Sequence, residues 1–261
     1  MAWQTDMILN ATAMGQGDSL VLLHGLFGAA RNFGIVQRQL AQRRRVIALD
    51  LRNHGVSPHD GDMRYATMAA DVLETLDRLS ALPATLLGHS MGGKVAMQAA
   101  LMHPDLTARL IVADIAPVAY PPHHRAIAEA MASLPMSRGM SRGQADAALA
   151  EAVPDAAVRA FLLQNLQLGA TPRWRIALTE IIAALPVIGA WDAPDDARYA
   201  GPTLFIAGAA SDYIRAEHRP AIRSLFPSAR FVTLKNAGHW LHAENPDGFV
   251  GVVEAFLTAT G

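Results

Sequence analysis

Residues 85–94 read Thr85-Leu86-Leu87-Gly88-His89-Ser90-Met91-Gly92-Gly93-Lys94, an apolar run that leads into a Gly-x-Ser-x-Gly motif. The run has the character of a buried strand, and an Ala-rich stretch of helical period, Lys94–Met102, follows it. A serine at such a sharp strand-to-helix turn adopts strained backbone angles, so glycine must stand two residues before and two residues after it. The motif therefore predicts that Ser90 is a nucleophile beside the positive end of a helix dipole.

The segments around this motif alternate between strand and helix patterns. Short apolar runs bounded by turn residues predict five more buried strands, at Ser19–His24, Val46–Asp50, Leu110–Asp114, Thr203–Gly208 and Phe231–Leu234. Helical patterns such as Met68–Leu79 lie between several of them. Continuous apolar strands are typical of a parallel sheet that is covered on both faces. The alternation predicts an α/β fold with a mostly parallel, doubly wound sheet.

One region interrupts this alternation. Residues 120–200 are rich in Ala, Leu and Arg in a helical pattern, contain several prolines and include no convincing strand. The region is far longer than an ordinary crossover connection. We interpret it as a helical cap inserted into one sheet domain, which would comprise residues 1–119 and 201–261.

The composition excludes several classes of function. The 22 Lys and Arg residues nearly balance the 23 Asp and Glu residues, so no strong field attracts nucleic acid. The chain has no cysteine, which rules out disulfides, a thiol nucleophile and thiolate metal sites. No apolar stretch is long enough to span a membrane, and no basic residue precedes Arg31 as it would in a signal peptide. These features predict a cytoplasmic enzyme.

A second glycine-containing loop is expected to complete the oxyanion hole. His24-Gly25-Leu26-Phe27-Gly28 directly follows the first predicted strand, where hydrolases with this motif place a backbone donor. We predict that the amides of Leu26 and Met91 hold the oxyanion. His24 is interpreted as a structural histidine that bonds to the backbone of a tight loop.

The general base is expected late in the chain, in the loop after the last strand. His239, in Asn236-Ala237-Gly238-His239-Trp240, occupies that place. A zinc site formed by His239 and His242 is not expected, because His-x-x-His is a weak pattern without a third ligand.

Two aspartates compete for the role of the acid that orients this histidine. Asp212 follows the Thr203–Gly208 strand, the usual place, but stands four residues beyond Gly208 where three is commoner. Asp114 ends the preceding predicted strand and could reach the same histidine. Sequence spacing alone leaves both candidates open.

The chain resembles the small YbfF-type esterases within the α/β-hydrolase superfamily over nearly its whole length. The strings that carry the resemblance include His24-Gly25-Leu26-Phe27-Gly28, Asp50-Leu51-Arg52-Asn53-His54-Gly55-Val56-Ser57-Pro58-His59, Gly88-His89-Ser90-Met91-Gly92-Gly93-Lys94, Asp114-Ile115-Ala116-Pro117 and Gly238-His239-Trp240. The resemblance implies an α/β-hydrolase fold with a Ser-His-Asp triad whose acid is Asp114. It also implies hydrolysis of short- to medium-chain carboxylic esters, and of acyl thioesters, under a helical cap and without a cofactor.

Several side chains that flank the expected site in sequence are candidates for binding the substrate: Phe27, Tyr120, Arg125, Tyr213 and Trp240. The partner is then a small-molecule ester, and the oligomeric state stays open. Two other functions compete with an esterase: a carbon–carbon bond hydrolase or synthase on the same triad, and a ligand receptor with little turnover. An intact nucleophile turn argues against the receptor.

Overall fold

The computed structural model describes residues 5–121 and 124–260. Within these residues, a seven-stranded sheet has the order β1-β3-β2-β4-β5-β8-β9, in which β1 pairs antiparallel with β3 and all other neighbours are parallel. Its strands are β1 (Ala11–Met14), β2 (Ser19–Leu23), β3 (Arg45–Leu49), β4 (Ala84–His89), β5 (Thr107–Ala113), β8 (Thr203–Gly208) and β9 (Ala229–Leu234). The expected mostly parallel α/β sheet is confirmed.

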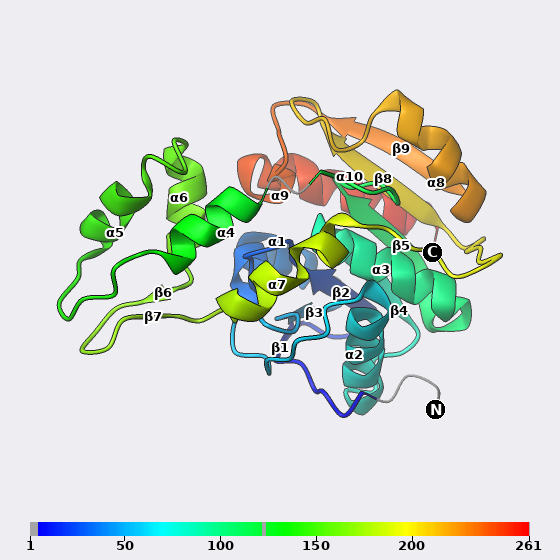
Figure 1. Cartoon of the computed structure of the whole chain (residues 1–261). Helices are drawn as coiled ribbons and strands as arrows, with labels where there is room; N and C mark the ends of the chain where they lie inside the picture. Colours follow the sequence, from blue (N-terminus) through cyan, green and yellow to red (C-terminus); the bar gives the residue numbers. More distant parts are fainter. Residues whose placement is uncertain (1–4, 122–123, 261) are drawn as a thin grey trace.

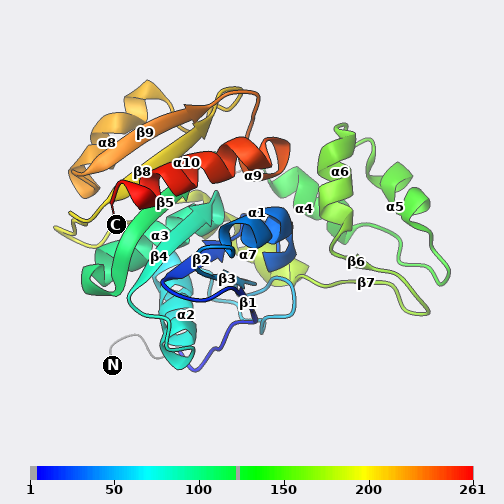
Figure 2. The ribbon, with the colours of Figure 1, turned by 180° about the vertical axis from the view of Figure 1, so that it is seen from behind.

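Helices cover both faces of the sheet, as Figures 1 and 2 show from opposite sides. These helices are α1 (Gly34–Leu40), α2 (Tyr65–Arg78), α3 (Met91–Met102), α8 (Arg219–Leu225), α9 (Leu241–Glu244) and α10 (Pro246–Thr258), with 3-10 turns η1 (Ala30–Phe33), η2 (Pro104–Leu106) and η3 (Ala216–His218). Alternate residues of β2 enter two separate cores: Leu20 and Leu22 pack with α1 and α10, whereas Val21 and Leu23 pack with α2 and α3. The continuous apolar run follows from this two-sided burial.

The antiparallel strand β1 was not expected from the sequence. Most of its residues are exposed, so it lacks the apolar run that marks the central strands. It pairs with β3, with Ala11 opposite Leu49, and so covers the edge that β3 would otherwise expose. Helix α2 also begins three residues before the Met68–Leu79 pattern, at Tyr65, whereas α3 begins at Met91, directly after Ser90.

The interruption at residues 120–200 is helical, with one difference from the expectation. It contains α4 (Arg125–Ala132), α5 (Arg142–Leu149), α6 (Ala156–Leu163) and α7 (Leu178–Gly189), and also a short antiparallel pair, β6 (Leu166–Gln167) and β7 (Arg173–Trp174). The expectation of no strand here was wrong, because two residues on each side are too few to produce a strand pattern. Figure 1 shows α5, α6, β6 and β7 projecting to one side, while α7 returns across the sheet domain.

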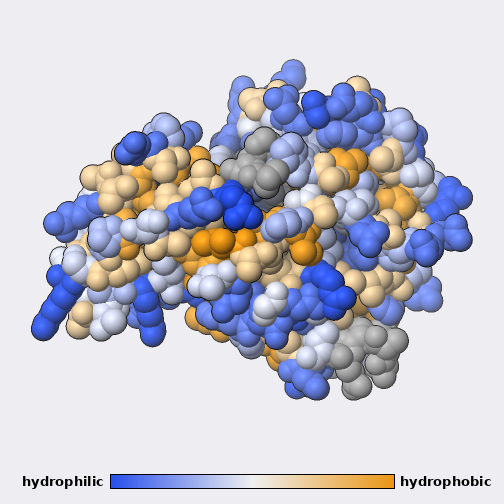
Figure 3. All heavy atoms as spheres, in the orientation of Figure 1, coloured by the Kyte–Doolittle hydropathy of each residue, from blue (hydrophilic) through white to orange (hydrophobic). Residues whose placement is uncertain are grey.

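Helix α7 presents apolar side chains at the surface where it crosses the sheet domain. In the orientation of Figure 1, these side chains form an apolar group over α7 (Figure 3). Residues 122 and 123, near the start of the interruption, lie outside the described residues, as do residues 1–4 and 261. Among the helices of the described chain, none combines the length and the apolar character needed to cross a membrane.

Candidate active site

Ser90 stands between β4 and α3 in a strained conformation. Its φ is 52° and its ψ is −120°, in the left-handed half of backbone space where a residue other than glycine is uncommon. A Cβ on Gly88 would lie 2.1 Å from the Gly92 carbonyl oxygen, and one on Gly92 would lie 2.3 Å from the Leu23 carbonyl oxygen. Both glycines are therefore required for strand and helix to approach so closely.

His239 lies within hydrogen-bond distance of Ser90. Its Nε2 is 3.1 Å from Ser90 Oγ, which is suitable for receiving the serine proton. The ring stacks on Tyr213 with centroids 4.0 Å apart. His89, which precedes the serine, donates from Nε2 to the His239 backbone oxygen at 2.7 Å. Ring and backbone of His239 are thus both held.

Asp114 contacts the other side of the imidazole. Its Oδ2 lies 2.7 Å from His239 Nδ1, and its Oδ1 accepts a bond from the Gly208 amide at 3.0 Å. The carboxylate is fully buried, and its backbone φ of 53° turns the residue at the end of β5. Asp212, the other candidate, is exposed. The structure brings Ser90, His239 and Asp114 into one line and leaves Asp212 outside it.

Ser211 is a member of this group that sequence reasoning missed. Its hydroxyl donates a short hydrogen bond to Asp114 Oδ2, the same oxygen that contacts His239. Ser211 is the third residue after Gly208, at the position where the acid is commoner. In this protein the third position after Gly208 holds a serine in place of the acid. Its hydroxyl supports Asp114, which the neighbouring strand supplies.

The loop at residues 24–28 forms a tight turn beside the nucleophile. Gly28 N–H donates to the Gly25 carbonyl at 2.9 Å, and Phe27 has a φ of 60°. The amides of Leu26 and Met91 donate to no acceptor within the described parts of the chain. Two backbone donors near Ser90 are what an oxyanion hole requires.

Two buried histidines hold this loop. His54 Nε2 accepts a hydrogen bond from the Phe27 amide at 3.2 Å, while its Nδ1–H donates to the Arg52 carbonyl at 2.8 Å. His24 bonds in the same way to the Leu51 amide and the Gly25 carbonyl, the structural role expected for it. Burial lowers the pKa of both rings, that of His54 to about 3, so they remain neutral acceptors.

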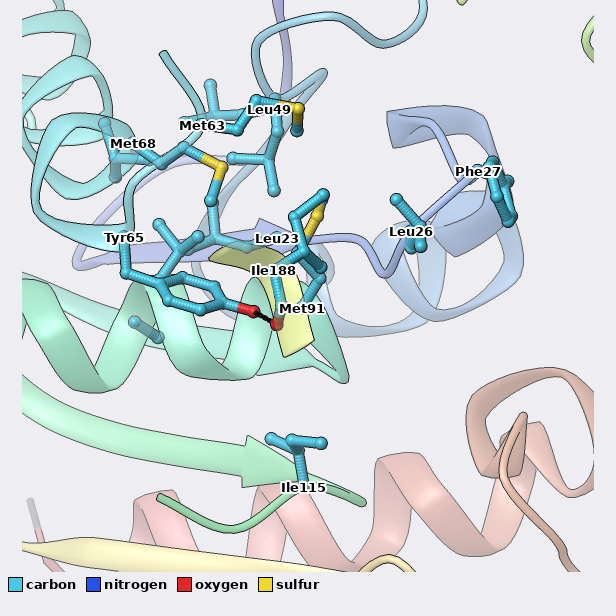
Figure 4. Close-up of a cluster of buried hydrophobic side chains, with 14 of the residues drawn as sticks. Leu23, Leu26, Phe27, Leu49, Met63, Tyr65, Met68, Met91, Ile115 and Ile188 are labelled. Atoms are coloured by element: carbon cyan, nitrogen blue, oxygen red, sulfur yellow. Dashed lines mark hydrogen bonds between the residues drawn. The ribbon is translucent and has the colours of Figure 1, made fainter. Parts of the chain in front are cut away.

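Two cavities adjoin Ser90. The narrow one has a volume of about 40 Å³ and is lined by Leu26, Tyr65, Ser90, Met91, Lys94, Ile115, Tyr120, Pro121, His124, Leu185, Ile188, Gly189 and Tyr213. The wide one has a volume of about 210 Å³ and includes Phe27, Phe161, His239 and Trp240. Figure 4 shows Leu26, Met91, Ile115 and Tyr65 among the apolar side chains of this region.

The candidate substrate-binding residues divide between these cavities. Tyr120 lines the narrow cavity, Phe27 and Trp240 line the wide one, and Tyr213 lines both. Arg125 does not line either cavity: its side chain is exposed on α4 and pairs with Glu129 at 3.5 Å. The expectation that Arg125 reaches the substrate finds no support in this arrangement, because its guanidinium lies on the outer surface of the helix.

The site offers little that would hold a metal ion. His242, the partner considered for a zinc site, is buried and packs its ring against Phe33 and His89 at centroid distances of 4.6 Å each. Across the described residues, no three side chains of His, Cys, Asp or Glu converge as a ligand set.

The fold and the geometry around Ser90 are those of a serine hydrolase. A model of the "Alpha/beta hydrolase family" matches residues 20–252, so the chain belongs to that family. The resemblance to YbfF-type esterases is confirmed: the chain is 36% identical to "Esterase YbfF" of Escherichia coli over 249 residues, covering 94% of this chain and 96% of that protein.

Two further relatives extend this comparison. The "sn-1-specific diacylglycerol lipase ABHD11" of Mus musculus is 41% identical over 248 residues, which cover 92% of this chain and 80% of the mouse protein. A solved structure described as "Marine microorganism esterase" superposes with a TM-score of 0.93 at 35% identity, covering 96% of this chain and 99% of the other. The protein is therefore an enzyme, as expected.

Proposed function

We propose that this protein is a carboxylesterase that hydrolyses short- to medium-chain acyl esters, and acyl thioesters of the same acids, through a Ser90–His239–Asp114 triad. The observation that carries the proposal is the hydrogen-bonded line from Ser90 Oγ through His239 to Asp114. Named relatives that are esterases or lipases support the same chemistry.

The mechanism is an acyl transfer in two steps. Ser90 Oγ attacks the ester carbonyl while His239 Nε2 takes the hydroxyl proton, and the amides of Leu26 and Met91 stabilise the negative oxygen of the tetrahedral intermediate. The imidazolium then gives its proton to the leaving alcohol, whose departure forms the acyl-enzyme. Water, activated by His239, releases the acid and regenerates Ser90. Asp114 orients the imidazole and stabilises its charged form.

We assign the two cavities to the two halves of an ester on the basis of their distance from His239 in the wall of the site. The leaving alcohol takes its proton from His239 Nε2 and must lie next to that ring, which lines the wide cavity and not the narrow one. The acyl chain then occupies the narrow cavity of about 40 Å³, which suits a short chain.

Residues 120–200 act as the cap over both cavities in this proposal. The narrow cavity takes Leu185 and Ile188 from α7, and the wide one takes Val158 and Phe161 from α6. Substrate specificity would then depend on this insertion, whereas the bond-breaking groups belong to the sheet domain.

The test is hydrolysis of p-nitrophenyl esters of increasing acyl length by the wild type and by Ser90→Ala. We expect the wild type to prefer short to medium acyl chains and Ser90→Ala to lose at least about a thousandfold in kcat. A fluorophosphonate should label the wild type stoichiometrically at Ser90 and leave Ser90→Ala unlabelled. Equal activity of the two proteins, or an unlabelled and inactive wild type that is folded by circular dichroism, would refute the proposal.

A further inference from the structure

Lys94 is a buried cation close to the nucleophile. Its side chain lies on α3 one helical turn after Ser90, and the residue is only 2% exposed. Its ammonium donates to the carbonyl of Ala190 at 2.8 Å and more weakly to that of Gly189 at 3.4 Å. Within the described residues, no carboxylate forms an ion pair with it. A buried charge normally has such a partner, because desolvation is costly.

The ammonium group stands in the wall of the narrow cavity. It lies 5.4 Å from the ring centre of Tyr65 and 5.1 Å from that of Tyr120, and all three residues line the cavity that contains Ser90. The two tyrosine hydroxyls are engaged elsewhere, that of Tyr65 with the Ile188 carbonyl at 2.6 Å, as Figure 4 shows. Two carbonyls account for two of the three ammonium hydrogens. One hydrogen remains for a ligand.

The choice of lysine at this position is unusual for this chain. Of the 22 basic residues only two, Lys94 and Lys235, are lysines, and Lys235 is exposed. Burial lowers the pKa of Lys94 to about 7. A lysine here can lose its proton when the cavity is empty and regain it beside an anion, whereas an arginine would stay charged.

We propose that the narrow cavity binds an acyl chain that ends in a carboxylate, and that the Lys94 ammonium pairs with it. The substrate class is then the monoester of a short dicarboxylic acid. This inference rests on the proposed function, in which Ser90 attacks the ester carbonyl. Ser90 caps α3 and Lys94 lies one helical turn further along it, and both line the narrow cavity, so a short acyl chain can reach from one to the other. The cavity volume of about 40 Å³ also favours a short chain.

The test compares pairs of ethyl esters that have the same shape and differ in charge. Monoethyl succinate is matched by ethyl 4-methylpentanoate, and monoethyl glutarate by ethyl 5-methylhexanoate, with two methyl groups replacing the two carboxylate oxygens. Ethanol release gives kcat/KM for each. The wild type should favour the charged member of a pair by about tenfold or more, as expected for a charge-assisted hydrogen bond.

Two variants assign this preference to one side chain. Lys94→Met should lower the ratio of charged to neutral kcat/KM by about tenfold or more, while Lys235→Met, which removes the exposed lysine, should keep the wild-type ratio. If Lys94 only fastens the end of α7, Lys94→Met will lower both rates equally and the unchanged ratio will overturn the inference.

The wild type alone can also overturn the dicarboxylate inference, so the test does not depend on Lys94→Met being able to fold. Hydrolysis of the neutral esters in preference to the charged ones would overturn the dicarboxylate inference and leave the esterase standing. If the wild type hydrolyses neither the four ethyl esters nor any p-nitrophenyl ester, both the dicarboxylate inference and the esterase proposal are overturned.

Discussion

Asp114 and His239 are 125 residues apart in sequence, yet Asp114 Oδ2 lies 2.7 Å from His239 Nδ1. The contact forms because β5, which Asp114 follows, is the neighbour of β8 in the sheet, and the loop after β9 bends back toward it. Gly208 and Ser211, from the end of β8 and the loop beyond it, donate to the same carboxylate. The acid of this site therefore comes from one strand and its supporting donors from the next.

Replacing this carboxylate by an amide should be far more damaging than the same change at the competing aspartate. Asp114→Asn keeps the shape but favours the wrong tautomer of His239, so kcat for ester hydrolysis should fall by about a thousandfold or more. Asp212→Asn, on the exposed side chain, should stay within about threefold of the wild type. Steady-state kinetics on one p-nitrophenyl ester measure both. The reverse order would mean that Asp212 is the acid.

His54 should affect catalysis although it lies outside the line of reacting groups. Its Nε2 accepts the Phe27 amide in the turn that carries Leu26. Without that acceptor the turn should shift, and a displacement of this kind can cost about a hundredfold in rate. We expect His54→Ala to lower kcat more than it raises KM, and His54→Gln, which retains an acceptor, to recover part of the loss. The exposed His59→Ala serves as the control, and a kcat for His54→Ala equal to that control would contradict the role.

Acid should destabilise this protein through histidines that are buried in the neutral form. Burial lowers the pKa of His54 and of His242 to about 3 from the usual 6.5. Below pH 6.5 the unfolded chain binds protons that the folded chain does not, so the free energy of unfolding falls as the pH drops toward 3. Each such histidine contributes a slope of about 1.4 kcal/mol per pH unit well below its unfolded pKa.

Urea titrations between pH 7.5 and 4.5 measure this slope. His54→Gln should reduce it by roughly one histidine's share, whereas the exposed His59→Gln should leave it unchanged. A stability that is flat over this interval would show that these rings are not held neutral in the folded state.

Two helical glycines should respond oppositely to alanine. A Cβ on Gly92 would lie 2.3 Å from the Leu23 carbonyl oxygen, whereas a Cβ on Gly251, which is exposed in α10, would meet no atom within 4 Å apart from the adjacent backbone of its own helix. Gly92→Ala should lower the free energy of unfolding by about 2–3 kcal/mol and abolish activity, because it separates helix and strand at the nucleophile. Gly251→Ala should raise that free energy by about 0.5–1 kcal/mol. Chemical denaturation measures both, and a neutral Gly92→Ala would contradict the packing argument.

The central strands and the nucleophile turn were predictable because their causes are local. The Thr203–Gly208 strand was predicted with the bounds it has, since burial on both faces demands an unbroken apolar run. The strand β1 was missed because an exposed edge strand carries no such run. Pocket residues near the catalytic loops, such as Tyr213 and Trp240, could be named from their sequence neighbours, but Arg125 on a helix surface could not be excluded in that way.

By itself, the sequence determined the α/β fold class and the positions of Ser90 and His239, because a strained turn needs glycine at fixed spacing and the base must follow the last strand. Residue spacing left two aspartates open and the family resemblance implied Asp114, which the tertiary structure places 2.7 Å from His239. Only the tertiary structure decided that Ser211 and His54 support the site, and that Lys94 faces a cavity without a carboxylate partner among the described residues. The physical reason is that these relationships are distances of about 3 Å between groups far apart in the chain. Spacing along a sequence specifies local conformation, whereas contacts between distant strands and loops depend on how the whole sheet is assembled.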